Sequence, residues 1–193
     1  MNMPLDAMTD ISDDALLVLY ANGDRAAASA LTYRLTPLVF SLANRVLNDH
    51  AEAEDVAQEA MLRLWKIAPN WRQGEAKVST WLYRVASNLC TDRLRKRRGV
   101  GLDEIAEPVD ETPDVPSRLQ TNSRAQALRQ ALGELPERQR KAVVLRHFEG
   151  LANPDIAEVL DISVEAVESL IARGKRSLSG LLLGRKKELG LEE

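Results

Sequence analysis

The sequence predicts an all-α protein made of two small helical domains joined by a flexible acidic linker. Alanine and leucine dominate both halves of the 193-residue chain, and both residues favour helices. No stretch alternates apolar and polar residues for long enough to build a sheet. With 45% hydrophobic residues, the chain can bury one ordinary core or two small ones.

The placement of charge divides the chain into four parts. Residues 1–70 carry 5 basic and 10 acidic side chains, whereas residues 71–98 carry 8 basic and 2 acidic ones. Residues 99–123 hold 1 basic and 6 acidic side chains with three of the eight prolines, which is typical of an extended linker. Residues 124–193 are nearly balanced, with 12 basic and 11 acidic side chains. We therefore expect a disordered N-terminus over 1–11, a first domain over 12–98, a linker over 99–123, a second domain over 124–183 and a tail over 184–193.

The first domain should begin with two helical stretches. Ser12 is placed to cap a helix that runs through Tyr20. A second helical stretch extends from Asp24 to Leu47, and we expect Pro37 to interrupt it.

A third predicted helix, over residues 51–68, separates an apolar side from a polar side. Val56, Ala60 and Leu64 recur at helical spacing and can face a core. The opposite side carries Asp55, Gln58, Glu59 and Leu62. Taken alone, such a carboxylate cluster is common on solvated helix faces.

The loop and helix that follow combine aromatic rings with basic charge. All three tryptophans, including Trp65, lie between residues 65 and 81. In the helix over residues 79–98, an outer stripe is formed by Trp81, Arg84, Asn88 and Arg95. Such a surface suits unpaired nucleic acid, because each base stacked on a ring contributes roughly 1–3 kcal/mol while basic groups follow the phosphates. The alternative is that the tryptophans are core residues and the basic run is a solvated helix end.

The second domain has the spacing of a helix-turn-helix. A helix over residues 135–150 is followed by a short helix over 153–160, a turn at Asp161 and a helix that Ser163 can cap. Many such motifs have glycine at the turn, and aspartate tolerates a left-handed backbone better than most residues.

The last of these helices presents a face that is acidic at its start and basic at its end. Glu165 and Glu168 are placed to accept hydrogen bonds from cytosine amino groups, while Arg173, Lys175 and Arg176 hold the DNA backbone. The alternative is that both glutamates merely favour the start of a helix.

The segments AEDVAQEAMLRLWK, STWLYRVASNLCTDRLRKRR and LGELPERQRKAVVLRHFEGLANPDIAEVLDISVEAVESLIARGKRSL occur in this order. Together they resemble the two conserved regions of a bacterial sigma factor of the extracytoplasmic-function group, from about Asp13 to Leu182. The resemblance implies a dissociable subunit of RNA polymerase that acts in a stress or envelope response. Its first domain would bind core polymerase and melt the minus-ten promoter element, and its second domain would read the minus-thirty-five element.

The resemblance also assigns individual residues. Asp55, Gln58 and Glu59 match the motif that docks on core polymerase. Asn88 and the loop before its helix match the pocket that captures a flipped minus-ten base, in a surface made of Trp71, Trp81, Arg84, Asn88 and Arg95. The helix from Val164 to Arg176 matches the minus-thirty-five reader, with Glu165, Glu168, Ser169, Ala172, Arg173, Lys175 and Arg176 exposed to DNA. The sequence departs from the family at Glu168, where arginine or lysine is common, and at Asp161.

Other classes of function have less support. His50 and His147 are 97 residues apart and Cys90 is the single cysteine, so no metal-ligand spacing, catalytic constellation or cofactor site is expected. No run of 18 apolar residues occurs, so we expect a cytoplasmic protein without membrane insertion. An ordinary helix-turn-helix regulator of duplex DNA and a helical adaptor that binds protein alone remain alternatives.

Three partners are expected: core RNA polymerase, promoter DNA and an anti-sigma factor. The third follows from the resemblance and from the lack of room for a sensor, since two domains and a linker account for nearly all of the 193 residues.

Overall fold

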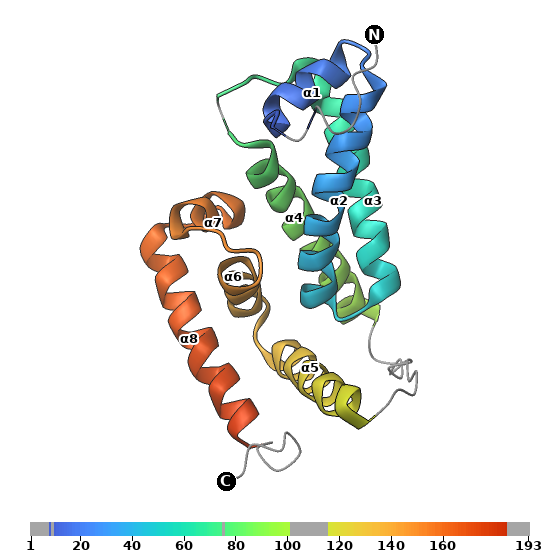
Figure 1. Cartoon of the computed structure of the whole chain (residues 1–193). Coiled ribbons are helices and arrows are strands. Elements are labelled where there is room, and N and C mark those ends of the chain that lie inside the picture. The colour runs from blue at the N-terminus through green and yellow to red at the C-terminus, as the bar shows by residue number, and fades with distance from the viewer. Residues whose placement is uncertain (1–7, 9, 75, 101–115, 185–193) are drawn as a thin grey trace.

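The computed structural model describes residues 8, 10–74, 76–100 and 116–184, with side chains undescribed at residue 100 and residues 116–123. Within these residues the chain is all-α, as predicted, and contains no strand (Figure 1). The elements are α1 (Asp13–Ala21), α2 (Arg25–Leu47), α3 (His50–Ile67), the short 3-10 helix η2 (Ala68–Asn70), α4 (Val78–Val100), α5 (Pro116–Glu134), α6 (Glu137–His147), α7 (Asn153–Leu160) and α8 (Val164–Leu183).

Side-chain caps begin the first three helices. The Ser12 hydroxyl accepts from the backbone N–H of Ala15 at 3.3 Å, which confirms the predicted start of α1. Asp24 caps α2 by accepting from Ala26 at 2.8 Å. Asp49 caps α3 in the same way, with a bond of 3.0 Å from the N–H of Glu52.

The expected interruption at Pro37 is wrong, because α2 continues through it. Proline removes one helical hydrogen bond and crowds the preceding turn, at a cost of about 3 kcal/mol. Leu35, Val39 and Leu42 are almost completely buried on both sides of Pro37. Burial of these side chains outweighs the local cost.

The expected disorder of residues 1–11 is wrong at its C-terminal end. Met8 is fully buried in the core, and the Arg34 guanidinium donates to the carbonyls of Met8 and Ile11, the latter at 2.7 Å. Arg34 also forms an ion pair with Asp13 at 3.1 Å. Residues 1–7 and 9 lie outside the described residues.

The predicted linker, residues 99–123, is too long at both ends. Helix α4 extends through Val100, and α5 begins at Pro116. Proline is well suited to a first helical turn, where its missing N–H costs nothing. Residues 101–115 lie outside the described part of the chain.

The helix-turn-helix is formed by α7 and α8. Asp161 adopts the left-handed conformation with φ of 55°, and the Ser163 hydroxyl accepts from Ala166 at 3.2 Å. Both features confirm the predictions made for this turn. Gly150, beyond the end of α6, also has a positive φ of 73°, so glycine suits the end of that helix.

Helix α8 approaches α6 closely at Gly174. A Cβ placed on Gly174 would lie 2.6 Å from Val143 Cγ2 and 3.3 Å from the carbonyl oxygen of Gln139. Only glycine fits between α8 and α6 at this position without a shift of the neighbouring groups.

The two halves of the chain pack on each other. Helices α6 and α7 lie against α2 and α4, and α5 also contacts α2 (Figure 1). Buried residues of the first half, such as Leu42 and Leu82, belong to the same core cluster as Leu145 and Ile156 of the second half. The described part of the chain is therefore one closed body.

Replacing Gly174 by alanine should destabilise the protein by about 1–3 kcal/mol, because the new methyl group overpacks the contact between α6 and α8. Gly180→Ala is the matched control, since nothing lies within 4 Å of its Cβ position in the same helix. That change should be neutral or stabilising by up to about 1 kcal/mol, through helix propensity. Urea denaturation followed by circular dichroism measures both, and equal stability of Gly174→Ala and parent would contradict the close packing.

Candidate nucleic-acid interface

Helix α3 presents the predicted polar face to solvent. Val56, Ala60 and Leu64 are fully buried, so Asp55, Gln58 and Glu59 lie on the outer side, where Asp55 and Gln58 are exposed and Glu59 is partly exposed. Leu62, on the same face, is 62% exposed.

Two carboxylates of this α3 face form ion pairs within the protein. Asp55 lies 3.5 Å from Arg93 of α4, and Glu59 lies 2.9 Å from Arg63. Exposed pairs of this kind contribute little stability, so their carboxylates can exchange these partners for others.

The three tryptophans have different environments. Trp65 packs with its ring centroid 4.6 Å from that of Tyr20, against the core, which agrees with the structural alternative for that residue. Trp71 and Trp81 are half-buried and meet edge to face at 6.1 Å. The indole N–H of Trp71 donates to Asp14 at 3.0 Å, so α1 holds the loop in place.

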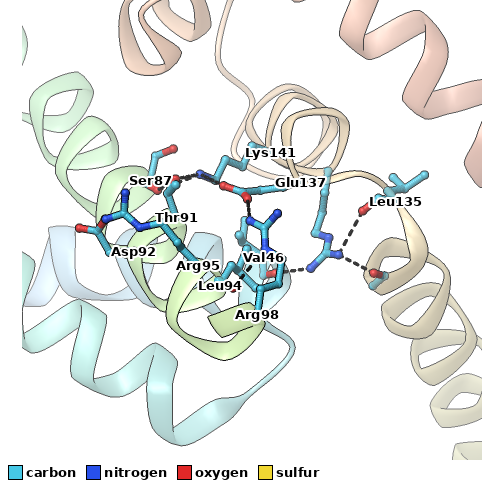
Figure 2. Close-up of polar contacts among 12 residues, drawn as sticks. Val46, Ser87, Thr91, Asp92, Leu94, Arg95, Arg98, Leu135, Glu137 and Lys141 are labelled. Atoms are coloured by element: carbon cyan, nitrogen blue, oxygen red, sulfur yellow. Dashed lines mark hydrogen bonds and ion pairs between the residues drawn. The ribbon is translucent and has the colours of Figure 1, made fainter. Parts of the chain in front are cut away.

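The outer stripe of α4 is accessible along its length. Arg84, Asn88 and Arg95 are exposed, and Trp81 at its N-terminal end is partly covered. Arg95 forms an ion pair with Asp92 at 2.7 Å (Figure 2). The structure therefore brings the loop tryptophan Trp71 and the stripe together into one basic and aromatic surface.

Two arginines of the basic run at the end of α4 form ion pairs with other helices of the protein. Arg97 pairs with Asp49 at 2.8 Å and with Glu52 at 3.0 Å, which joins α4 to the start of α3. Arg98 pairs with Glu137 of α6 at 2.8 Å. These two arginines are therefore engaged in ion pairs within the chain, a role that differs both from contact with nucleic acid and from a solvated helix end.

Acidic residues of the second domain approach the basic side of the first. Arg84 lies 3.8 Å from Asp161, at the turn between α7 and α8. Lys77, before α4, lies 3.8 Å from Asp155 of α7. The α4 surface is consequently bordered by carboxylates in this arrangement.

Helix α8 exposes the whole of its predicted reading face. Its inner side is fixed by Val167 and Gly174, both buried. The exposed residues are Glu165, Glu168, Ser169, Ala172, Arg173, Lys175 and Arg176.

The two glutamates of this face differ in their surroundings. Hydrogen bonds from its own backbone N–H and from the Ser163 side chain hold the pKa of Glu165 below its ordinary value. This contact favours the helix-start explanation for Glu165. Glu168 lies almost one turn further along the exposed face and is the better candidate for contact with a base.

Sequence reasoning missed a group of polar residues between the two domains. Glu149, Arg140 and Lys141 are buried or nearly so, and they bond to atoms of α2 and α4. One signal was present, since Arg140 and Lys141 directly precede the apolar run Ala142–Leu145, which is buried throughout. Basic residues joined to such a run are candidates for burial.

Neither a metal-binding cluster nor a membrane-spanning helix occurs among the described residues. No cluster of three or more histidine, cysteine, aspartate and glutamate side chains there could hold a metal ion. In the same part of the chain, no helix combines the length and the apolar character needed to cross a membrane.

Comparison with known families covers both domains. Residues 32–100 match Sigma-70 region 2, and residues 125–178 match Sigma-70, region 4. The first match contains α3 and α4, and the second contains the helix-turn-helix. Fold and exposed faces thus define a two-domain helical DNA-binding protein of the sigma-70 type.

Individual relatives extend this result over nearly the whole chain. The chain is 32% identical over 186 residues to the RNA polymerase sigma-H factor of Pseudomonas aeruginosa, with 91% of this chain and 96% of that protein covered. It is 33% identical over 171 residues to the ECF RNA polymerase sigma factor SigM of Mycobacterium tuberculosis, with 89% and 85% covered. The chain belongs to the extracytoplasmic-function group of RNA polymerase sigma factors.

Solved structures share the fold. CnrH, solved in complex with the cytosolic domain of CnrY, gives a TM-score of 0.68 at 26% identity, covering 89% of this chain and 97% of CnrH. The sigma factor RpoE from Bartonella quintana, solved with the anti-sigma factor NepR, gives 0.63 at 21% identity, covering 80% and 95%. The second likeness concerns the fold alone.

Proposed function

We propose that this sigma factor binds core RNA polymerase through α3, opens the minus-ten element with α4 and its preceding loop, and reads the minus-thirty-five element with α8. The observation that carries this proposal is the exposure of three different faces on one helical framework. The α3 face is acidic, the α4 surface is basic and aromatic, and the α8 face ends in three basic residues. Each charge pattern suits its proposed partner.

Residues 12–98 and 124–183 are the units to which we assign these two sets of contacts. The chain acts by binding rather than by catalysis, without a cofactor, and it works in the cytoplasm, where core polymerase and promoter DNA are found. An ordinary regulator of duplex DNA would use α8, but it would have no need of the aromatic surface made by Trp71 and Trp81.

We also propose an anti-sigma factor as a third partner. Its support is the likeness to CnrH, which was solved with a bound protein domain and matches 89% of this chain at 26% identity. A partner that binds the free chain alone withdraws it from the polymerase equilibrium by mass action.

The α3 face can be tested by replacing Asp55, Gln58 and Glu59 together with alanine. Core binding should weaken by about 2 kcal/mol or more, because charged interface residues are frequent hot spots. Glu54→Ala removes an exposed carboxylate at the edge of the same face, about 100° from Asp55 and one turn before Gln58, and should weaken binding less than the triple change. A titration with core polymerase measures the affinity of each variant. Unchanged affinity of a triple variant with normal helicity would contradict the assignment.

Asn88→Ala should impair discrimination at one minus-ten position, as expected when a flipped base loses a hydrogen-bonding partner. Run-off transcription from promoters altered at each minus-ten base measures the loss. Duplex binding through α8 should survive and serves as the internal control. An unchanged base preference at every position would remove Asn88 from the proposed pocket.

Glu168→Arg and Arg176→Ala should have different effects on the minus-thirty-five element. Glu168→Arg should alter the preference at one base by about 1–3 kcal/mol. Arg176→Ala should weaken binding to all sequences, and it should lower the slope of log binding constant against log salt concentration by roughly one. Selection from randomised DNA, followed by binding at several salt concentrations, measures both. Identical selected sequences for parent and Glu168→Arg would leave the helix start as the explanation of that glutamate.

A further inference from the structure

The contact between the two domains contains a buried carboxylate from the second domain whose hydrogen bonds come from the first. The Glu149 side chain is 3% exposed. It accepts hydrogen bonds from the Ser41 hydroxyl of α2 at 2.7 Å and from the Tyr83 hydroxyl of α4 at 3.0 Å. Arg45 of α2 lies 3.8 Å away and stacks over the Phe148 ring at 4.7 Å.

The phenol of Tyr83 is suited to its role as a donor. Burial, followed by the charge and hydrogen bond of Glu149, raises the pKa of Tyr83. The hydroxyl therefore keeps its proton and continues to donate to the carboxylate.

A buried ammonium group makes a second contact across the same boundary. Lys141 of α6, with a side chain 5% exposed, donates to the backbone carbonyl of Ser87 at 2.9 Å and also to the Thr91 hydroxyl (Figure 2). Glu137, on its own helix, lies 2.9 Å from the same nitrogen. Separating the domains would remove the α4 acceptors from Lys141 and would let water reach it.

These contacts hold the second domain against the surface proposed to open DNA. The same packing places Asp161 beside Arg84 and Asp155 beside Lys77, each at 3.8 Å. Phosphates that approach this edge of α4 would meet carboxylates already paired with its cations. The closed arrangement therefore weakens the attraction of this edge for DNA.

Promoter geometry makes the closed arrangement incompatible with binding both elements. Elements centred about 25 base pairs apart are separated by roughly 85 Å along B-form DNA. Helix α8 has 20 residues, so it is about 30 Å long, and the turn before it lies beside Arg84 of the α4 surface. The two DNA-binding surfaces must therefore move apart for one promoter to be bound.

We propose that Glu149 with Ser41 and Tyr83, and Lys141 with Ser87 and Thr91, form a latch that keeps the free chain closed and must open when core polymerase binds. The proposal rests on the proposed sigma function for its consequence, but the closed state itself is a property of the free chain. Binding then costs the free energy of opening, which lowers apparent affinity in proportion to the open fraction.

The test is the double variant Ser41→Ala/Tyr83→Phe, which removes both hydroxyls from Glu149 and changes no residue assigned to DNA or polymerase. Ser29→Ala/Tyr33→Phe is the matched control, because it makes the same chemical changes at exposed positions of α2. Spin labels at Arg25→Cys and Ser179→Cys, both exposed sites, report the distance between the domains. Cys90 is fully buried in the closed chain, and it is replaced by alanine in every labelled protein because charges of the second domain act on its thiol and opening can change its exposure.

In the free chain, parent and control should give one narrow distance distribution, and the double variant should gain a broad population at other distances. The double variant should also bind core polymerase about 3- to 10-fold more tightly than the control. A broad distribution in the parent, an unchanged one in the double variant, or opening without a gain in affinity would overturn the latch. Failure of parent and control alike to bind core polymerase would count against the sigma function, while the distances would still decide the latch.

Discussion

The burial of Lys141 and Glu149 between the domains is the constraint on which the closed structure depends. An ionised side chain is removed from water only when other groups replace its hydrogen bonds. Here those groups belong largely to α2 and α4 of the other domain, through Ser41, Tyr83 and Ser87. The arrangement of the two domains is therefore set by directional polar contacts in addition to apolar packing. Once the domains part, the same polar groups can form hydrogen bonds with water instead. Contacts of this kind are therefore suited to an interface that opens and closes.

The exposure of α8, the helix proposed to read DNA, depends on two backbone positions. Asp161 takes a left-handed conformation at the turn, and Gly174 allows α8 to approach α6 at a distance that a Cβ would prevent. With its inner side fixed in this way, α8 exposes its outer side from Glu165 to Arg176. The same turn brings Asp161 to Arg84, so the geometry that exposes α8 also joins this helix to the α4 surface, which is the other surface proposed to bind DNA.

Much of the fold could be predicted from local chemistry. Ser12 and Ser163 cap their helices, and the helical spacing of Val56, Ala60 and Leu64 identified the buried side of α3. Pro37 was misjudged because a proline rule describes an isolated helix, whereas burial on both sides holds α2 together. The extent of α5 was missed because proline in a charged stretch indicates a loop as readily as a first helical turn. The interdomain contacts of Glu149 and Lys141 could not be predicted, since they depend on how two separately patterned units meet. The roles of the exposed site residues remain predictions, because exposure shows only that they are available.

Promoter opening with purified core polymerase tests the sigma function most directly. DNA bound to this chain alone, to core polymerase alone and to both together should be probed with permanganate, which modifies unpaired thymines. The account predicts reactive thymines at the minus-ten element only when chain and core polymerase are both present, with transcription starting just downstream. Protection of duplex DNA by the chain alone, without any reactive thymine or transcript when core polymerase is added, would contradict it and favour a regulator that binds duplex DNA.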